Sequence, residues 1–235
     1  MPEQELPHDF DHEHADVSGG WLRPATFGAM DGLVTNTALI AGVGAVSDAH
    51  AVVLSGVAGL VAGACSMALG EYTSVTTANE QIDSEVEVEQ RAFETHPHAE
   101  KAELVAMFQK MGLSRDTAVK ATDELHQDEA AAVNFHLVQE LGIDPQEKPS
   151  APLAAISSFV MFAIGAVIPL LPYLVGFHSL WAGLSCGGIG LLIAGGVAAR
   201  FTRKPLWQGS LRQLALGAVA VGATYLVGTL IGRMI

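Results

Sequence analysis

Apolar residues gather in five long runs along this chain, separated by short polar stretches and by one long polar block. The runs cover roughly 27 to 47, 51 to 76, 153 to 174, 179 to 199 and 209 to 232. Each holds about 20 residues, which at ~1.5 Å per residue reaches across a hydrocarbon layer of ~30 Å. No run alternates strictly between apolar and polar residues, and helices satisfy their own backbone hydrogen bonds in lipid. The pattern predicts an all-α membrane protein with five transmembrane helices.

The polar block between the second and third runs, about 77 to 150, is typical of a helical domain outside the membrane. It holds 16 of the 25 acidic residues and six of the 12 basic ones. Pro97 and Gly112 predict breaks between helices, because proline stops a helix and glycine favours a C-cap. We expect three helices: the second span continued through about Phe93, one from Ala99 to about Met111, and one from Ser114 or Arg115 to Leu141.

The basic residues predict how the chain is oriented in the membrane. With the N-terminus inside, 11 of the 12 basic residues lie on the cytoplasmic side and only Arg233 lies outside. The 11 are Arg23, the six of the polar block, and the cluster Arg200, Arg203, Lys204 and Arg212. Because Lys and Arg concentrate in cytoplasmic loops, this bias predicts a cytoplasmic N-terminus and a cytoplasmic polar block.

The first 20 residues differ from both the spans and the polar block. His8, His12 and His14 alternate with acids there, and no basic segment leads into an apolar core as in a secretory signal. We expect a disordered, solvated tail, with weak metal binding as the alternative. The predicted organisation is a tail at 1–20, spans one and two at 21–76, the cytoplasmic acidic domain at 77–150, and spans three to five at 151–235.

Composition changes the picture mainly through charge. Half of the 235 residues are hydrophobic and the net charge is −13. The acidic surplus argues against a nucleic-acid partner, because phosphate binding needs Lys and Arg. An acidic surplus is better suited to binding cations.

Two of the acids lie inside predicted spans. Asp31 lies in the first span and Glu71 lies towards the end of the second, both among small residues. A carboxylate in hydrocarbon costs roughly 2.5 to 3.5 kcal/mol even on lenient scales, so such residues usually face a bundle interior or a water-filled cavity. We therefore predict a polar pathway, and the alternative is that both acids are solvated at the membrane boundary. Glycine pairs such as Gly28/Gly32 have the GxxxG spacing that lets helix backbones approach.

Acids in the polar block recur at helical spacing. Glu85 and Glu89 are four apart, and Glu100 and Glu103 are three apart, so each pair projects from one helix face. Like charges at this spacing repel each other unless a cation lies between them. His136 and Glu140, also four apart, add a nitrogen and an oxygen ligand. The spacing predicts a metal site, and the alternative is a solvated acidic helix.

Four motifs, in this order along the chain, resemble those of the vacuolar iron transporter family, which is found in plant and fungal vacuoles and in prokaryotes. They are MDGLVTNTALIAGVGA, GLVAGACSMALGEYTSV, the ELGI…EKP junction and FAIGAVIPLLPY. The likeness runs from about Trp21 to the C-terminus. It implies a homodimer of five-span subunits that moves Fe²⁺, and often Mn²⁺, out of the cytoplasm in exchange for protons. The metal is then a substrate, with no prosthetic group, and the protein is not an enzyme.

The resemblance also assigns roles to residues. Asp31, Met67 and Glu71 match the family's membrane pathway. The matches to the family's metal-gathering domain are Glu89, Glu100, Glu103 and Glu140. The chain departs from the family at Ala92, where a second glutamate is usual, and at His136 and Leu137, where plant members have Met and Glu. Imidazole is therefore expected to replace another ligand.

The types of ligand predict which metal ion is bound, and the sequence argues against two other classes of protein. Carboxylate, thioether and imidazole ligands suit a borderline divalent ion better than Mg²⁺ or Ca²⁺. Protons compete for the same ligands, which is a physical basis for antiport. A di-iron enzyme would need Glu-x-x-His pairs on facing helices, and neither the apolar runs nor the polar block contains one, whereas a structural membrane protein would leave Asp31 and Glu71 without a role. We expect the plasma membrane of a bacterium, with a vacuolar membrane as the alternative.

Overall fold

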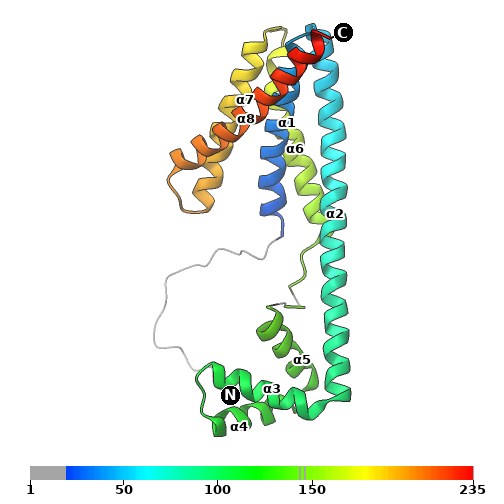
Figure 1. The fold of residues 1–235 in the computed structure, drawn as a ribbon, viewed down its shortest axis with the longest axis vertical. Coiled ribbons are helices and arrows are strands. Elements are labelled where there is room, and N and C mark those ends of the chain that lie inside the picture. Colours follow the sequence, from blue (N-terminus) through cyan, green and yellow to red (C-terminus); the bar gives the residue numbers. More distant parts are fainter. Residues whose placement is uncertain (1–19, 143, 146, 235) are drawn as a thin grey trace, which may run out of the picture.

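The structure, a computed structural model, describes residues 20 to 142, 144 to 145 and 147 to 234, so nearly all of the predicted tail lies outside the described residues. The described residues are all-helical, as expected (Figure 1). The elements are α1 (Leu22–Gly44), α2 (Ala49–Thr95), α3 (Pro97–Lys110), α4 (Arg115–Leu125), α5 (Glu129–His136), the π-helical turn η1 (Leu137–Leu141), α6 (Ala151–Leu174), α7 (Leu180–Phe201) and α8 (Leu206–Gly232).

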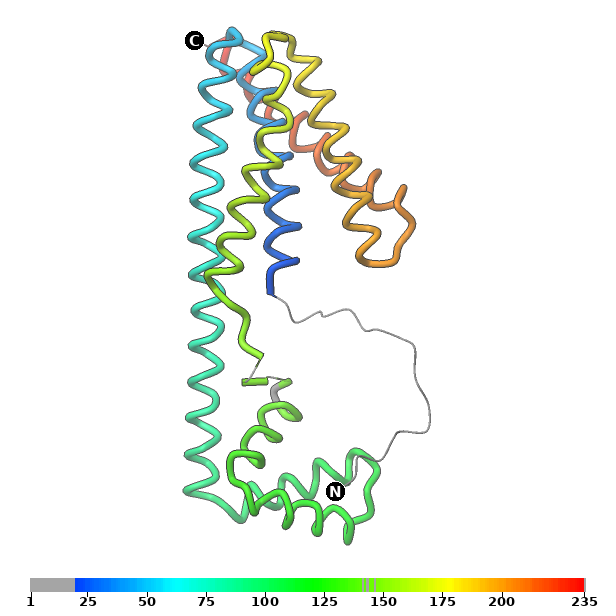
Figure 2. Tube along the Cα trace, turned by 180° about the vertical axis from the view of Figure 1, so that it is seen from behind, coloured from blue at the N-terminus to red at the C-terminus, as the bar shows by residue number. Residues whose placement is uncertain are grey.

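The molecule is elongated and has two parts that α2 connects (Figures 1 and 2). Helices α1, α6, α7, α8 and the first half of α2 form a bundle at one end. Helices α3, α4 and α5 lie at the other end beside the last turns of α2, and we call these elements, with η1, the distal helices. The 47 residues of α2 extend for ~70 Å, more than twice the ~30 Å of a hydrocarbon core. Its second half therefore projects beyond the bundle.

Helix α1 is the centre of the bundle, because it packs against α2, α6, α7 and α8. Its closest neighbour is α6. A Cβ atom at Gly32 would collide with the Phe162 carbonyl, and one at Gly165 would collide with the Ala29 carbonyl. The buried Asn36 side chain donates a hydrogen bond to the Ala166 carbonyl across the same contact. Small residues therefore bring the two backbones together, as the GxxxG spacing predicts.

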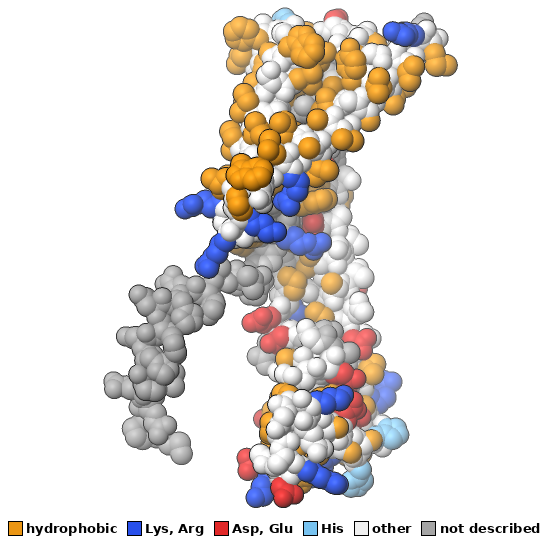
Figure 3. Space-filling model, turned by 60° about the vertical axis from the view of Figure 1, so that its left-hand side comes forward, with side chains coloured by type: hydrophobic (Ala, Val, Ile, Leu, Met, Phe, Trp, Pro, Cys, Tyr) orange, Lys and Arg blue, Asp and Glu red, His pale blue; other side chains and the backbone are white. Residues whose placement is uncertain are grey.

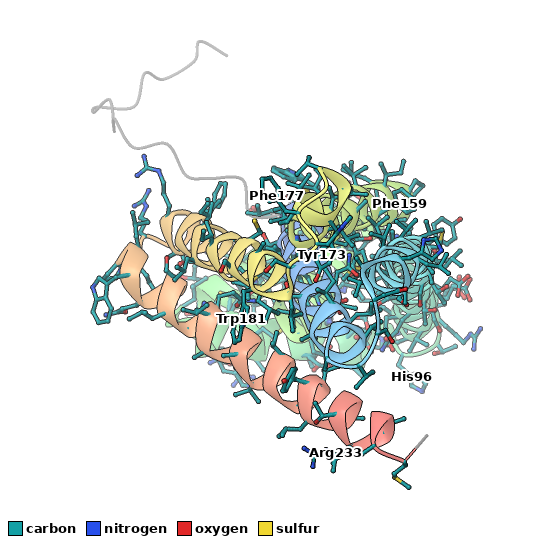
Figure 4. All side chains as sticks on the ribbon, turned by 90° about the horizontal axis from the view of Figure 1, so that it is seen from above. His96, Phe159, Tyr173, Phe177, Trp181 and Arg233 are labelled. Atoms are coloured by element: carbon teal, nitrogen blue, oxygen red, sulfur yellow. The ribbon has the colours of Figure 1, made fainter. Side chains whose placement is uncertain are left out.

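The end of the bundle remote from the distal helices is closed by an apolar cluster of Ile40, Val52, Leu170 and Tyr173. Figure 4 looks down on this end, where Tyr173 lies among the helices. Hydrophobic side chains cover the outer surface of the bundle, whereas charged side chains gather on the distal helices and at the boundary between the two parts (Figure 3). This distribution fits a bundle surrounded by lipid and distal helices surrounded by water.

Four of the described helices, α2, α6, α7 and α8, are long and apolar enough to cross a membrane, so the chain has the features of a multi-pass membrane protein. Helix α1 is not among them, because Asp31, Asn36 and several glycines lower its mean hydropathy. A helix enclosed by four others needs little apolar surface of its own. The five-span count therefore stays a prediction.

The prediction of three helices in the polar block, the first of them continuing the second span, is confirmed for the first two and wrong for the third. Helix α2 ends at Thr95, Pro97 begins α3, and Gly112 has a φ of +99° at the next break. The third helix is divided into α4, α5 and η1. The reason is Asp128, whose side chain accepts a hydrogen bond from the Ala131 amide and starts a new helix.

Candidate metal centre

Three side chains from three different helices converge in the distal part of the molecule. Glu89 comes from α2, Glu100 from α3 and His136 from α5, and one ligand atom of each lies within 4.8 Å of the others. The His136 Nδ1 atom is 3.1 Å from Glu89 Oε1 and 3.7 Å from Glu100 Oε2. These separations fit a single cation held between the three groups.

Local sequence explains why these side chains meet. Pro97 occupies the first position of α3, so the chain turns sharply at His96 and places Glu100 in the first turn of α3, close to the end of α2. Helix α5 is held against α2 by an apolar cluster of Phe93, Ala132, Val133 and Leu137. The Phe93 ring also meets the His136 ring edge-on, with centroids 5.0 Å apart. Packing therefore fixes the imidazole beside Glu89.

The centre is almost closed to solvent. The His136 side chain is 0% exposed, that of Glu89 13% and that of Glu100 14%. Among the described residues, Glu89 Oε1 and both ring nitrogens of His136 are buried and have no hydrogen-bond partner, because the close approach of the two side chains is not a hydrogen bond. Each such atom costs about 1 to 3 kcal/mol. A bound cation would satisfy the carboxylate oxygen and one ring nitrogen at once.

Burial and mutual repulsion shift the protonation of these groups. Burial, followed by the charges of Glu100, Glu140 and Glu103, raises the pKa of Glu89 to about 7. Burial and the neighbouring Glu103 and Glu140 raise the pKa of Glu100, against a smaller opposing effect of His96.

The pKa of His136 is lowered, chiefly by burial and further by His126, although Glu103 opposes the shift. His136 is therefore held neutral, which is the form that binds a metal ion.

The structure divides the six predicted ligands of this domain into three groups. Glu89, Glu100 and His136 form the centre. Glu103 and Glu140 are exposed, but they lie close enough for their charges to act on Glu89. Glu85 lies one turn before Glu89 on α2, and no contact of its side chain with the centre is found among the described residues.

His126, at the end of α4, is a further residue of this centre that spacing did not predict. Its ring stacks on Phe93 at a centroid distance of 5.4 Å, on the residue that also contacts His136. Within the part of the chain that the structure describes, both of its ring nitrogens are buried without a hydrogen-bond partner. The signal in the sequence was a pair of histidines ten residues apart, one before α5 and one at its end. That signal becomes informative only once the break before Asp128 is known.

The three predicted pathway residues lie in the bundle, each half-buried. Asp31, on α1, accepts a hydrogen bond from the Thr35 hydroxyl at 3.1 Å. Met67, on α2, packs against the apolar cluster of Ala64, Phe162 and Ala166, and Glu71 follows one turn later. No contact between Asp31 and Glu71 is present among the described side chains.

Fold and site together define a multi-pass membrane protein that carries a candidate metal centre of two carboxylates and an imidazole on helices outside the bundle. The chain belongs to the VIT family, whose profile matches residues 22 to 229. This family consists of transporters, so the expectation that the protein is not an enzyme is confirmed.

Several known proteins are similar to this chain over most of its length. It is 33% identical to a vacuolar iron transporter of Acanthamoeba castellanii over 93% of this chain and 82% of that protein. It is 29% identical to vacuolar iron transporter 1 of rice, Oryza sativa subsp. japonica, over 91% of this chain and 88% of the relative. It is also 33% identical to vacuolar iron transporter homolog 1 of Arabidopsis thaliana, over 89% and 84%. The predicted resemblance to this family is confirmed.

Proposed function

We propose that this protein is a proton-coupled antiporter that exports Fe²⁺ from the cytoplasm, with Mn²⁺ as a further ion. The observation that carries the proposal is the convergence of Glu89, Glu100 and His136, one ligand atom of each lying within 4.8 Å of the others. Among the described residues, Glu89 Oε1 and the His136 ring nitrogens also lack hydrogen-bond partners. The names of the relatives, vacuolar iron transporters, support iron as the transported metal.

The donor set supports an ion of the first transition row. Mg²⁺ and Ca²⁺ prefer oxygen ligands alone, whereas imidazole suits Fe²⁺, Zn²⁺ and similar ions. A buried, neutral His136 therefore favours transition metals over the far more abundant Mg²⁺. Glu103 and Glu140 add negative charge at the entrance, which attracts a divalent cation and repels anions.

The proposed route runs along α2. Glu89 and Glu71 lie on this one helix, 18 residues or ~27 Å apart. Metal gathered at the distal centre would pass to Asp31, Met67 and Glu71, where the two carboxylates exchange it for protons. We further propose a homodimer with a cytoplasmic N-terminus and a cytoplasmic distal part, in a bacterial plasma membrane. A vacuolar membrane is the alternative that the names of the relatives favour.

Transport by the full-length protein in proteoliposomes tests this proposal. Vesicles with a metal-quenched dye inside should take up Fe²⁺ or Mn²⁺ faster when their lumen is more acidic than the bath. Glu89→Gln should slow uptake at low metal concentration by roughly 10-fold or more, the size usual for losing a group that supports a metal site. The matched control, Glu94→Gln, changes an exposed acid on the same helix and should leave uptake unchanged. Uptake that ignores the pH gradient would contradict antiport.

A further inference from the structure

A long apolar groove opens on the side of the bundle between α1, α6 and α7. It encloses about 790 Å³, and apolar side chains line almost all of it, with Thr26 and Ser157 as the hydroxyl-bearing exceptions. Figures 1 and 2 show the cause, since α7 diverges from α1 and α6 towards the end of the bundle that faces the distal helices. Trp21, Leu153 and Phe201 line this wide end, and Leu171 and Cys186 line the narrow end.

The groove lies within the apolar bundle, so its surroundings are lipid. From Phe201 to Cys186 it follows α7 for 15 residues, or ~22 Å, which is longer than one half of a ~30 Å hydrocarbon core. Water is excluded from the hydrocarbon core, so it does not fill an apolar groove there. The apolar groups that a membrane offers instead are the acyl chains of its lipids. The volume falls in the range of roughly 300 to 1,000 Å³ that buries small ligands elsewhere.

Basic residues surround the wide end of the groove. Arg23 follows two lining residues, and Arg200 lies next to Phe201. Figure 3 shows Lys and Arg side chains gathered at this edge of the apolar surface. The exposed cluster is Arg23, Arg200, Arg203, Lys204 and Arg212. Within the part of the chain that the structure describes, no carboxylate pairs with any of these five, so their charge remains available.

We propose that the groove binds one anionic phospholipid, with an acyl chain between α1, α6 and α7 and the phosphate among the basic cluster. The acyl chain matches the apolar length of the groove, and the phosphate matches the cationic residues at its wide end. The acidic residues 1 to 19 could neutralise the cluster, but they contain no apolar run to fill the groove. Because basic residues near the membrane surface attract anionic headgroups, this cluster predicts a preference over a zwitterionic lipid of roughly 10-fold or more.

Tryptophan quenching by brominated lipids tests the site in the full-length protein. With Trp181→Phe and Trp207→Phe, the remaining Trp21 lies in the wide end of the groove. In phosphatidylcholine vesicles, a few per cent of brominated phosphatidylglycerol should quench Trp21 roughly 10-fold more effectively than the same fraction of brominated phosphatidylcholine. A second protein that keeps only Trp181, which is exposed at the opposite end of the bundle, should show no preference.

The basic cluster and the apolar groove are tested by separate variants. Arg200→Gln with Arg203→Gln and Lys204→Gln should remove most of the preference at Trp21, because only Arg23 and Arg212 of the cluster remain, whereas Arg233→Gln at the far end should leave it unchanged. Ala194→Phe, which fills the groove, should also reduce quenching, unlike Ala215→Phe on the exposed surface of α8. Equal quenching by both lipids, or a preference that survives either groove or charge variant, would overturn the proposal. Because metal plays no part in this measurement, its result is independent of transport.

Discussion

At the scale of single residues, Glu89 governs the chemistry of the candidate centre. Its carboxyl group is nearly buried beside Glu100 and His136, and its pKa is raised to about 7. About half of the protein molecules therefore carry a proton on Glu89 at neutral pH. A divalent ion binds the carboxylate, so it must displace that proton. If the centre binds metal as proposed, metal binding and proton release are thereby linked there.

We expect metal binding to release close to one proton at pH 6 and much less at pH 8. Glu89 is mostly protonated below its pKa of about 7 and mostly ionised above it. His136 contributes little, because its lowered pKa keeps it neutral through most of this range. Calorimetry of Mn²⁺ binding in two buffers of different ionisation enthalpy measures the number. Glu89→Gln should remove most of the difference between the two pH values and leave only the part due to Glu100, whose pKa is also raised. An undiminished wild-type difference in this variant would assign the proton elsewhere.

Spacing along the sequence identified Glu89, Glu100 and His136 because helical periodicity shows which side chains share a face. It could not exclude Glu85, which has the same spacing, because only the direction of α3 and α5 decides which turn of α2 they meet. It also missed His126, whose contact with Phe93 depends on tertiary packing. Periodicity restricts the candidates, and packing between helices selects among them.

At the scale of helices, apolar runs predicted the bundle well, because a lipid-facing helix must be apolar over its whole length. The break before Asp128 was harder to predict, since the residues around it are compatible with a continuous helix and only the side-chain cap ends it. Helix α1 shows a second limit of predicting membrane helices from hydropathy. Of the five helices in the bundle it packs against the most neighbours, and it is the one that is not apolar enough over a full span, because those neighbours cover it.

The crossing of α1 and α6 can be tested through its glycines. Gly32→Ala adds a methyl group that would meet the Phe162 carbonyl, a backbone atom that cannot move aside alone. Such overpacking typically costs about 1 to 3 kcal/mol, so thermal unfolding in detergent should begin at a clearly lower temperature. Gly222→Ala on α8 is the control, because nothing lies within 4 Å of its added methyl group. Equal melting of both variants would show that the two helices are farther apart.

At the scale of the whole molecule, α2 connects the candidate centre among the charged distal helices to the apolar bundle. Where α1 lies relative to the bilayer determines which side of the membrane each part occupies. In the five-span arrangement, α1 crosses the membrane and separates Trp21 from Ser47. If α1 does not cross, these two residues lie on the same side.

Cysteine labelling of intact cells distinguishes the two arrangements. In a background with Cys65 and Cys186 changed to alanine, a membrane-impermeant maleimide should modify Ser47→Cys but not Trp21→Cys or Glu124→Cys. The expectation follows from the basic residues, which concentrate near Trp21 and around the turn between the end of α7 and the start of α8, on the same side as the distal helices. Labelling of Trp21→Cys together with Ser47→Cys would contradict a membrane-crossing α1.

The last prediction concerns the coupling between the two parts of the molecule. Asp31→Asn and Glu71→Gln keep the shape of each side chain but remove its exchangeable charge. If both residues belong to the proton-coupled path, each variant should abolish metal uptake driven by a pH gradient in proteoliposomes. The centre at Glu89 lies ~27 Å along α2 from Glu71, so both variants should bind Mn²⁺ in calorimetry as the wild type does.

This pair of measurements separates a blocked path from a misfolded protein, because binding at the distal centre requires α2, α3 and α5 in place. Glu80→Gln, an exposed acid on α2 between the two sites, is the control and should transport normally. A variant of Asp31 or Glu71 that still moves metal at the wild-type rate under the same gradient would remove that residue from the path. The distal centre would then deliver its metal by a route through the bundle that avoids that carboxylate.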